Sequence, residues 1–438
     1  MPVLGAGGWQ AEDMAPSFAI SINDHEIDEN VCKLIQEVEY DSADNIADML
    51  KLRISNKDFA VSDKKVFQVG NVIKLWMGFN TLEYIGAAII EKVRPDFPQE
   101  AMPTIEVIAY SADRLMMRNS PAASDEAKPF LSAKEQEEKR EAEHKAKIRG
   151  QIVRNNFRRW PEGLLYSDVI EQKALAYGFD VDIDATPQDI VGPMGIIQKV
   201  GMTDYQFLAG IANELKWLFW VDMPEDGKKW VLHFRDPDFF EEAQDRKYTF
   251  RYNSDTDGES PAHRWSGSAP STLLSFEGEQ LMGEGATDLQ IQIKNPLTGQ
   301  LENYTISADP PQDAESVEFV DDVSEAVAEG LELDLSVVTL SFGNVAVKVI
   351  ADRQFQTPQQ AKQWAERWYN EHHRDFFSGR GVVRGPGVES LRAMQVHGAE
   401  GLGELWSGDY YYVNVVHKMN ERDGYTVTWD GRKVTSSA

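Results

Sequence analysis

The sequence has a single cysteine, Cys32, in 438 residues. One cysteine excludes a disulfide within the chain and nearly excludes a metal site built on thiolates. No apolar run approaches the roughly 18 residues that a membrane span requires. Residues 1–17 lack a basic segment followed by an apolar core, so we expect no secretion signal. These absences favour folding in a reducing cytoplasm and predict no insertion into a membrane.

Basic residues are also scarce, since 44 Lys and Arg stand against 72 Asp and Glu, which gives a net charge of −28. An acidic surface repels nucleic acid, so we expect no specific nucleic-acid binding. Hydrophobic residues make up 42% of the chain and aromatic residues 10%, which is enough for packed cores. A chain of this length predicts two to four domains.

Motifs that carry chemistry are missing as well. The stretch HEIDE lacks the second histidine of a zinc-binding His-Glu-x-x-His motif. Residues 253–258, NSDTDG, resemble the start of a calcium loop, but Arg264 stands where the bidentate Glu is required. HGAEGLG does not have the glycine order of a dinucleotide-binding turn, and no P-loop or nucleophile elbow occurs. We therefore expect no cofactor, no metal, no catalytic residue and no enzymatic activity.

Period-two hydrophobicity is what the first part of the chain does have. After an arm at residues 1–16, apolar residues alternate in SFAISI (residues 17–22) and in MLKLRIS (residues 49–55). Further segments of this kind follow, separated by Gly, Asn and Pro. Short strands at this spacing predict a first antiparallel β-barrel over residues 17–118.

The middle of the chain predicts an α+β domain at residues 151–245. It follows residues 119–150, which are charged and lack an apolar stripe, and which we interpret as a solvated helix or linker. Ser167 is expected to cap one helix, and Thr203 with Gln206 forms a capping-box pattern for a second. PEDG between two aromatic-rich strands predicts a hairpin. We expect its tryptophans, Trp217, Trp220 and Trp230, to fill a hydrophobic core rather than to form a flat surface that binds a sugar.

The last part of the chain, residues 246–438, predicts a second β-barrel. It would carry an acidic insertion at residues 309–335 and a helix at residues 358–377, and a hairpin at residues 410–429 would close it. Strict alternation turns one face of this hairpin to the core: Tyr411, Val413, Val415, Tyr425, Val427 and Trp429. It leaves four residues on the other face as candidate subunit-interface residues: Tyr410, Tyr412, Thr426 and Thr428.

Several motifs, taken in order, resemble the late control protein D family, the baseplate hub of contractile phage tails, which is related to the hub part of type VI secretion spikes. They include VEYDSADNIADMLKLRISN, FQVGNVIKLWMGFN, GMTDYQFLAGIANELKWLFWVD with WVLHFRD, and WSGDYYYVNVVHKMNERDGYTVTWDGR. The resemblance covers nearly the whole chain, although the segments 119–150 and 309–335 match no pattern of the family. In the family the final hairpin closes the second barrel, and its histidine matches His417.

The resemblance implies a mainly β fold of two related antiparallel barrels joined by a small α+β domain and assembling as a ring. It implies a homotrimer that joins the hexameric tail tube to the trimeric central spike and lines the channel for tape measure and DNA. The implied partners are the chain itself, the spike, tail tube and tape measure proteins, and the baseplate wedge proteins. The implied location is the virion tail baseplate, assembled in the host cytoplasm.

Two alternatives stay open at this point. The chain would be the hub of a type VI-like secretion spike if its gene lies among secretion effectors rather than among sheath and tube genes. It would be a tail-associated peptidoglycan hydrolase if the protein clears a suspension of peptidoglycan. The net charge also leads us to expect a channel wall that is net negative.

Overall fold

The computed structural model describes the chain in separate stretches. The predicted charged segment 119–150 and the acidic insertion 309–335 lie outside the described residues, as do the arm 1–16 except Pro16 and the helix 358–377 except Phe377. The domain boundaries given above therefore stay a prediction. The described residues are 16–118 (without 45, 60, 64, 65 and 80), 157–160, 164–187, 191, 196–199, 201–215, 217–236, 248–252, 272–280, 288–294, 301–307, 347–350 and 377–434 (without 386).

The chain forms two compact units. The first comprises Met1–Gln188, Met194–Leu281 and Arg374–Ala438, and the second comprises Asp189–Pro193 and Met282–His373. In the second unit, three strands form a sheet in the order β16-β15-β17, with β15 and β16 antiparallel and β15 and β17 parallel. Their bounds are Asp288–Lys294 for β15, Leu301–Ser307 for β16 and Val347–Ile350 for β17.

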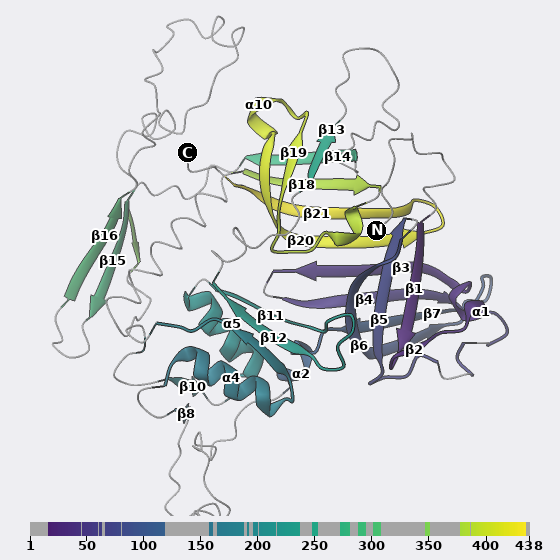
Figure 1. Cartoon of the computed structure of the whole chain (residues 1–438), viewed down its shortest axis with the longest axis horizontal. Helices are drawn as coiled ribbons and strands as arrows, with labels where there is room; N and C mark the ends of the chain where they lie inside the picture. Colours follow the sequence, from purple (N-terminus) through teal and green to yellow (C-terminus); the bar gives the residue numbers. More distant parts are fainter. Residues whose placement is uncertain are drawn as a thin grey trace, which may run out of the picture. The chain divides into compact units, whose positions relative to one another are not determined.

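One 13-stranded sheet dominates the first unit, and its two halves are curved into two barrels (Figure 1). The half that we call the first barrel has the strand order β3-β4-β7-β6-β5-β1-β2. Its elements are β1 (Pro16–Ile22), β2 (His25–Glu26), α1 (Glu29–Cys32), β3 (Ile35–Ala43), β4 (Ile46–Ser55), η2 (Lys57–Phe59), β5 (Val72–Phe79), β6 (Glu83–Asp96), β7 (Thr104–Tyr110) and α2 (Asp113–Met116).

The other half, the second barrel, has the strand order β19-β13-β14-β18-β21-β20 and closes because β19 also pairs with β20. The long hairpin that sequence periodicity predicted is present as β20 and β21. The elements are β13 (Thr249–Tyr252), β14 (Thr272–Gln280), β18 (Phe377–Arg384), η4 (Val388–Ser390), β19 (Val396–Glu400), α10 (Gly403–Trp406), β20 (Gly408–Asn420) and β21 (Gly424–Val434).

The two barrels repeat one strand order. The series β3-β4-β7-β6-β5 of the first barrel corresponds to β14-β18-β21-β20-β19 of the second, and neighbouring strands within each series are antiparallel. The correspondence also keeps the order along the chain, because β3, β4, β5, β6 and β7 match β14, β18, β19, β20 and β21 in turn. The barrels are therefore structural repeats without a visible sequence repeat, and the prediction of two related barrels is confirmed.

A single hydrophobic core runs through both barrels. Leu50, Leu52 and Ile54 on β4 are fully buried, as their period-two spacing predicted, and they belong to the same cluster as Val427 and Trp429 on β21. Burying each such side chain contributes roughly 1.5–3 kcal/mol to folding. Because they share this extensive core, we expect the two barrels to unfold together rather than as independent domains.

The middle α+β region confirms most of its predicted elements. Thr203 and Gln206 form the predicted capping box before α5, because the Gln206 backbone N donates to Thr203 Oγ1 (3.1 Å) and the Thr203 backbone N donates to Gln206 Oε1 (3.0 Å). The predicted hairpin is β11 with β12, and β9 adds a parallel strand. The elements are β8 (Phe157–Arg159), α4 (Tyr166–Ala176), β9 (Asp180–Ile183), β10 (Ile197–Lys199), α5 (Asp204–Leu215), β11 (Leu218–Asp222) and β12 (Val231–Arg235).

The predicted cap of the first helix is wrong. Ser167 lies inside α4, where its Oγ accepts a hydrogen bond from the backbone N of Thr186 (3.3 Å). The helix instead begins after Leu165, whose backbone N donates to Asp168 Oδ2 (2.8 Å). A serine is a good cap only where its side chain is free to accept from the first turn, and here a neighbouring segment engages it.

Candidate functional site

The joint between the two barrels is the pairing of β20 with β3, and we use the word joint for it throughout. Seven residue pairs join the strands in antiparallel register, from Asn414 opposite Ala43 to Asn420 opposite Glu37. Figure 1 shows the yellow β20 beside the purple β3. The N-terminal part of β20 pairs with β19 of its own barrel, so the strand crosses from one barrel to the next. Backbone hydrogen bonds thus make one continuous sheet of two barrels.

Side chains across the joint are complementary. Lys418 on β20 forms ion pairs with Glu37 (2.8 Å) and Glu39 (3.3 Å) on β3, and the hydrogen bond with Glu37 raises the pKa of Lys418. Asn414 Nδ2 donates to Asp41 Oδ1 (2.6 Å). The cation therefore lies on the β20 side of the joint and the anions on the β3 side.

The closing hairpin corrects the predicted assignment of faces. Tyr410 and Tyr412 are fully buried in the core of the chain itself, where the Tyr412 ring stacks on Trp429 with 4.5 Å between centroids. The pairing of β20 with β21 shifts between Tyr412 and Asn414, so Val413 is a bulged residue. A bulge adds one residue to one strand and reverses the alternation beyond it. Interface roles for Tyr410 and Tyr412 are therefore wrong, because their side chains point inward.

The returning strand has the predicted faces. Tyr425, Val427 and Trp429 are fully buried, whereas Thr426 and Thr428 are half-buried on the outer face. No contact of Thr426 or Thr428 with another subunit is tested, so their role at a subunit interface stays a prediction. The bulge has no residue signature in YYYVNVV, and strict alternation could not have located it.

His417, the histidine singled out by the family resemblance, is a buried residue of the joint, opposite Tyr40. Its Nε2–H donates to the backbone O of Leu391 (2.8 Å), and the hydroxyl of Tyr425 donates to its Nδ1 (2.7 Å). Burial and the nearby Arg392 guanidinium lower the pKa of His417 to about 3. Both nitrogens are engaged and the ring is neutral, so His417 is a structural histidine.

Arg392 lies beside this histidine, with Nη1 3.4 Å from His417 Nε2, and neither Arg392 nor Glu389 was found from the sequence. Arg392 Nη1 donates to the backbone O of Glu389 (2.7 Å), and Nη2 donates to the backbone O of Tyr84 (2.5 Å) on β6. Arg392 thus ties the β18–β19 connection of the second barrel to the first barrel. Burial raises the pKa of Glu389 to about 7. No local motif marks an arginine whose partners are backbone carbonyl groups.

Glu389 makes the stability of the protein depend on pH. Its pKa is higher in the folded protein than in the unfolded chain, so its contribution is fully present below about pH 4.5 and is lost as pH rises toward about 7. We expect Glu389→Gln to gain up to about 3 kcal/mol relative to the parent over this range. Urea denaturation at a series of pH values checks this. Glu421→Gln, at an exposed turn, is the control, and a difference between E389Q and parent that does not change with pH would contradict the prediction.

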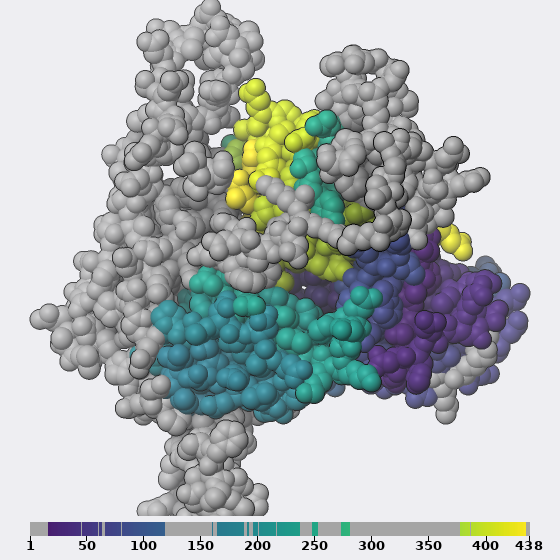
Figure 2. All heavy atoms as spheres, in the orientation of Figure 1, coloured from purple at the N-terminus to yellow at the C-terminus, as the bar shows by residue number. Residues whose placement is uncertain are grey.

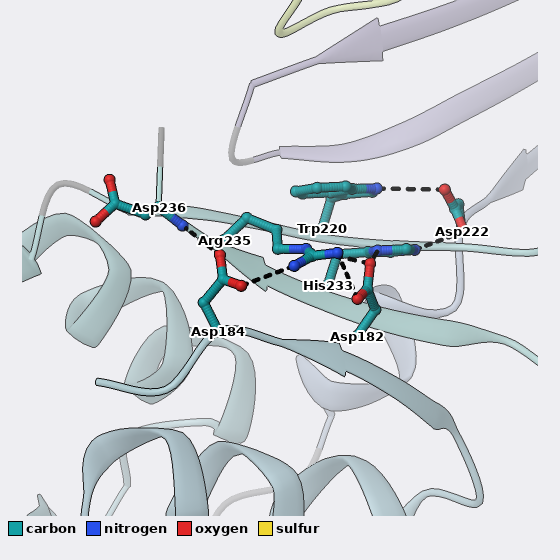
Figure 3. Close-up of polar contacts among 7 residues, drawn as sticks. All are labelled: Asp182, Asp184, Trp220, Asp222, His233, Arg235 and Asp236. Atoms are coloured by element: carbon teal, nitrogen blue, oxygen red, sulfur yellow. Dashed lines mark hydrogen bonds and ion pairs between the residues drawn. The ribbon is translucent and has the colours of Figure 1, made fainter. Parts of the chain in front are cut away.

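A polar cluster covers one face of the β11-β12-β9 sheet (Figure 3). The Nδ1 of His233 lies 2.9 Å from Asp182 Oδ2, and its Nε2 lies 3.1 Å from Asp222 Oδ1. The ring of His233 is stacked on Trp220, with 4.5 Å between centroids and 3° between planes. Burial opposes the charge on His233, but the hydrogen bonds and charges of Asp222 and Asp182 raise its pKa.

Arg235 extends this cluster. It forms ion pairs with Asp182 (2.6 Å) and Asp184 (2.7 Å), and the backbone N of Asp236 donates to Asp184 Oδ2 (3.1 Å). A catalytic histidine needs one nitrogen directed at a substrate, whereas both nitrogens of His233 meet carboxylates and one ring face meets Trp220. The cluster therefore braces the three strands together. Within the described part of the chain, no group of three or more His, Cys, Asp or Glu side chains is arranged to hold a metal ion.

The tryptophans of this region do not form a platform for a sugar. Trp217 and Trp230 are buried, and Trp217 packs against Phe234 with 5.0 Å between centroids. Trp220 packs against the small cluster of Leu218 and Met394. Core filling, the interpretation favoured from the sequence, describes Trp217 and Trp230, whereas Trp220 is half-buried and stacks on His233.

The tip of the β11–β12 hairpin contacts the first barrel, and Figure 2 shows the teal middle region against the purple strands. Lys74 Nζ on β5 donates to the backbone O of Gly227 (2.9 Å), Trp76 Nε1 donates to Glu225 Oε1 (2.8 Å), and the Tyr84 hydroxyl donates to the backbone O of Met223 (2.6 Å). These contacts hold the middle region against the barrel through the predicted PEDG turn.

Among the described helices, none has the length and apolar character needed to cross a bilayer.

Solved structures of phage tail proteins match nearly the whole chain. A tail protein from Neisseria meningitidis MC58 aligns with a TM-score of 0.57 and 11% identity, over 96% of both chains. The 43 kDa tail protein of prophage MuSo2 from Shewanella oneidensis aligns with a TM-score of 0.56 and 9% identity, over 96% of this chain and 98% of that one. The chain has the fold of these phage tail proteins.

Comparison by sequence does not detect this fold. No protein-family model matches the chain, and no curated protein matches it. At 9–11% identity the likeness is one of backbone architecture, which confirms the fold that the ordered motifs implied. The two barrels, the joint and the middle region of this chain are the basis for inferring what it does.

Proposed function

We propose that the chain is a structural baseplate hub of a contractile phage tail. The observation that carries this is the joint: two barrels with one strand order are linked edge to edge within a single chain. Three such chains would place six similar barrels in a ring, and this sixfold ring would match a sixfold tail tube. The trimer itself is threefold, so it would also match a threefold spike. The fold shared with phage tail proteins supports this reading.

The proposed partners follow from this geometry. They are two further copies of the chain, the central spike, the tail tube and tape measure proteins, and the baseplate wedge proteins of a virion tail assembled in the host cytoplasm. The role is one of binding and alignment rather than catalysis, which agrees with His233 and His417 being engaged in structural hydrogen bonds. Genes for sheath and tube beside this one would support the phage hub over a secretion spike hub.

The purified chain, alone or with its spike partner, should have about three times the 49.4 kDa mass of one protomer. Native mass spectrometry and light scattering at micromolar concentration measure this. A stable monomer under both conditions would argue against the hub.

The channel wall of the ring should be net negative. Each chain has a charge of −28, so a trimer would have three times that charge, and like charges keep DNA from adhering to the wall. We expect no measurable DNA binding by the trimer in low salt, by electrophoretic mobility shift. Tight binding that weakens steeply with added salt would show a basic lining instead.

A further inference from the structure

The internal repeat identifies the edges by which one chain should join the next. At the joint, the C-terminal half of β20 leaves its own barrel and pairs with β3. The strand that corresponds to β20 in the first barrel is β6, and the strand that corresponds to β3 in the second barrel is β14. If adjacent barrels are joined alike around a ring, β6 of one chain meets β14 of another.

Both of these strands have an open edge where the repeat requires one. The N-terminal part of β6 pairs with β5 as β20 pairs with β19, but from Glu91 to Asp96 its described partner is β7 alone. On β14, the described partner from Ser275 to Gln280 is β18 alone, whereas β13 reaches only as far as Leu273. Six residues on each strand thus have one edge without a described strand partner, similar in length to the seven pairs of the joint.

Equivalent bulges strengthen the match between β6 and β20. The pairing of β6 with β7 shifts at Glu91, and the pairing of β20 with β21 shifts at Val413. In both strands the bulge separates the part that pairs with a further strand of its own barrel, β5 or β19, from the rest of the strand. In β20 the rest shares its second edge with β3, and in β6 the rest has no described strand on that edge. Because a bulge bends a strand and increases its twist, it would aim the second half of β6 outward as it aims that of β20.

One pair of charges at the open edges is complementary, as charges are at the joint. Arg94 on β6 is exposed and forms an ion pair with Glu106 of β7 (3.2 Å), and Asp96 occupies the position that corresponds to Lys418. Glu277 and Glu279 on β14 are exposed and lie on the outer face of the sheet. Arg94 and Glu279 have opposite charges, so this one pair would attract across the two edges.

Exposed apolar side chains continue the same two edges. Phe97 (55% exposed) and Met102 (56% exposed) lie in the loop that follows β6, and Phe97 contacts Phe59 with 5.9 Å between ring centroids. Leu274 (47% exposed) lies at the start of the open edge of β14. In an antiparallel pairing the loop after β6 runs toward the start of β14, which brings these side chains together and removes them from water.

We propose that residues 93–96 of β6 in one protomer pair antiparallel with residues 277–280 of β14 in a second copy of this chain, as β20 pairs with β3 within the chain. This inference rests on the proposed ring of three chains. Opposite Asp41, the joint places Val416. Matching the bulge at Glu91 with that at Val413 puts Arg94 at the position of Val416. Matching the bulge of β14 at Leu274 with that of β3 at Gln36 puts Glu279 at the position of Asp41, so Arg94 faces Glu279 of the neighbour.

Disulfide trapping tests this register. In a Cys32→Ser background, Arg94→Cys with Glu279→Cys should oxidise to a covalent trimer on a non-reducing gel, because directly opposed residues of antiparallel strands have the spacing that a disulfide spans. Val416→Cys with Asp41→Cys is the positive control and should close within one chain. Arg94→Cys with Arg380→Cys, on the non-edge strand β18, is the negative control and should give no covalent trimer.

Reversal of charge gives a second measurement. Glu279→Lys should weaken association more than about tenfold, because it places a second cation opposite Arg94 across the interface. Adding Arg94→Glu should restore it. A trimer by native mass that yields no covalent trimer and ignores the charge reversal would overturn the β6–β14 pairing but leave the hub intact. A monomer by native mass would overturn the hub itself.

Discussion

Val427→Asp should prevent the chain from folding, whereas Val413→Asp should cost no more than about 1 kcal/mol. Val427 is fully buried opposite His417 in the core of the second barrel, so a carboxylate there loses its hydration without gaining a partner. Val413 occupies the bulge and is only half-buried. The expected loss at Val427 is several kcal/mol, which is a large share of the stability of a typical domain.

The two variants differ only in position on one hairpin, so each is the control for the other. Soluble yield, size-exclusion chromatography and urea denaturation measure the difference. Equal damage at both positions would mean that Val413 also points into the core, and the bulge would have to be abandoned.

Lys173→Met should lower the free energy of unfolding by about 3–5 kcal/mol, because it leaves a buried carboxylate without its counter-ion. Lys173 and Asp204 form a buried ion pair between α4 and α5. The Tyr177 hydroxyl (2.9 Å) and Gln198 Nε2 (2.9 Å) donate to the same carboxylate, which fixes its place. Methionine matches the length of lysine but supplies no charge.

An exposed pair provides the comparison. Lys229 and Asp180 are 3.0 Å apart with both side chains more than half exposed, so Lys229→Met should change the free energy of unfolding by less than about 1 kcal/mol. Adding Asp204→Asn to Lys173→Met removes the uncompensated charge and should recover part of the loss. Denaturant unfolding of the parent, K173M, K229M and the K173M/D204N double variant measures these free energies. Similar losses in the free energy of unfolding for K173M and K229M would contradict the prediction.

Local patterns predicted the elements whose stability is local. Leu50, Leu52 and Ile54 showed their buried face through alternation alone, and Thr203 with Gln206 showed a helix start within four residues. The ordered motifs predicted the mainly β fold with two barrels, which the structure and its solved neighbours confirm. Such patterns work because a strand face or a helix cap depends on residues a few positions apart.

Features that depend on distant residues were out of reach. Ser167 is a good cap by composition, but Thr186 engages it. Tyr410 and Tyr412 were placed on the wrong face because one extra residue at Val413 reverses the alternation. The ion pair of Lys173 with Asp204 joins residues 31 positions apart. Each depends on how segments meet in three dimensions, which a single sequence does not display.

The joint also has a consequence for synthesis on the ribosome. Asp41 of β3 and Asn414 of β20 are 373 residues apart. At roughly 5–20 residues per second, on the order of 20 to 75 s would pass between the emergence of β3 and that of the strand that covers it. During this interval the nascent first barrel would expose an unpaired β-edge to other nascent chains, and neighbouring ribosomes on one message would bring such edges close together. The outward-facing acidic residues of β3, Glu37, Glu39 and Asp41, would then repel like edges until β20 arrives, when Lys418 pairs with Glu37 and Glu39 and Asn414 donates to Asp41.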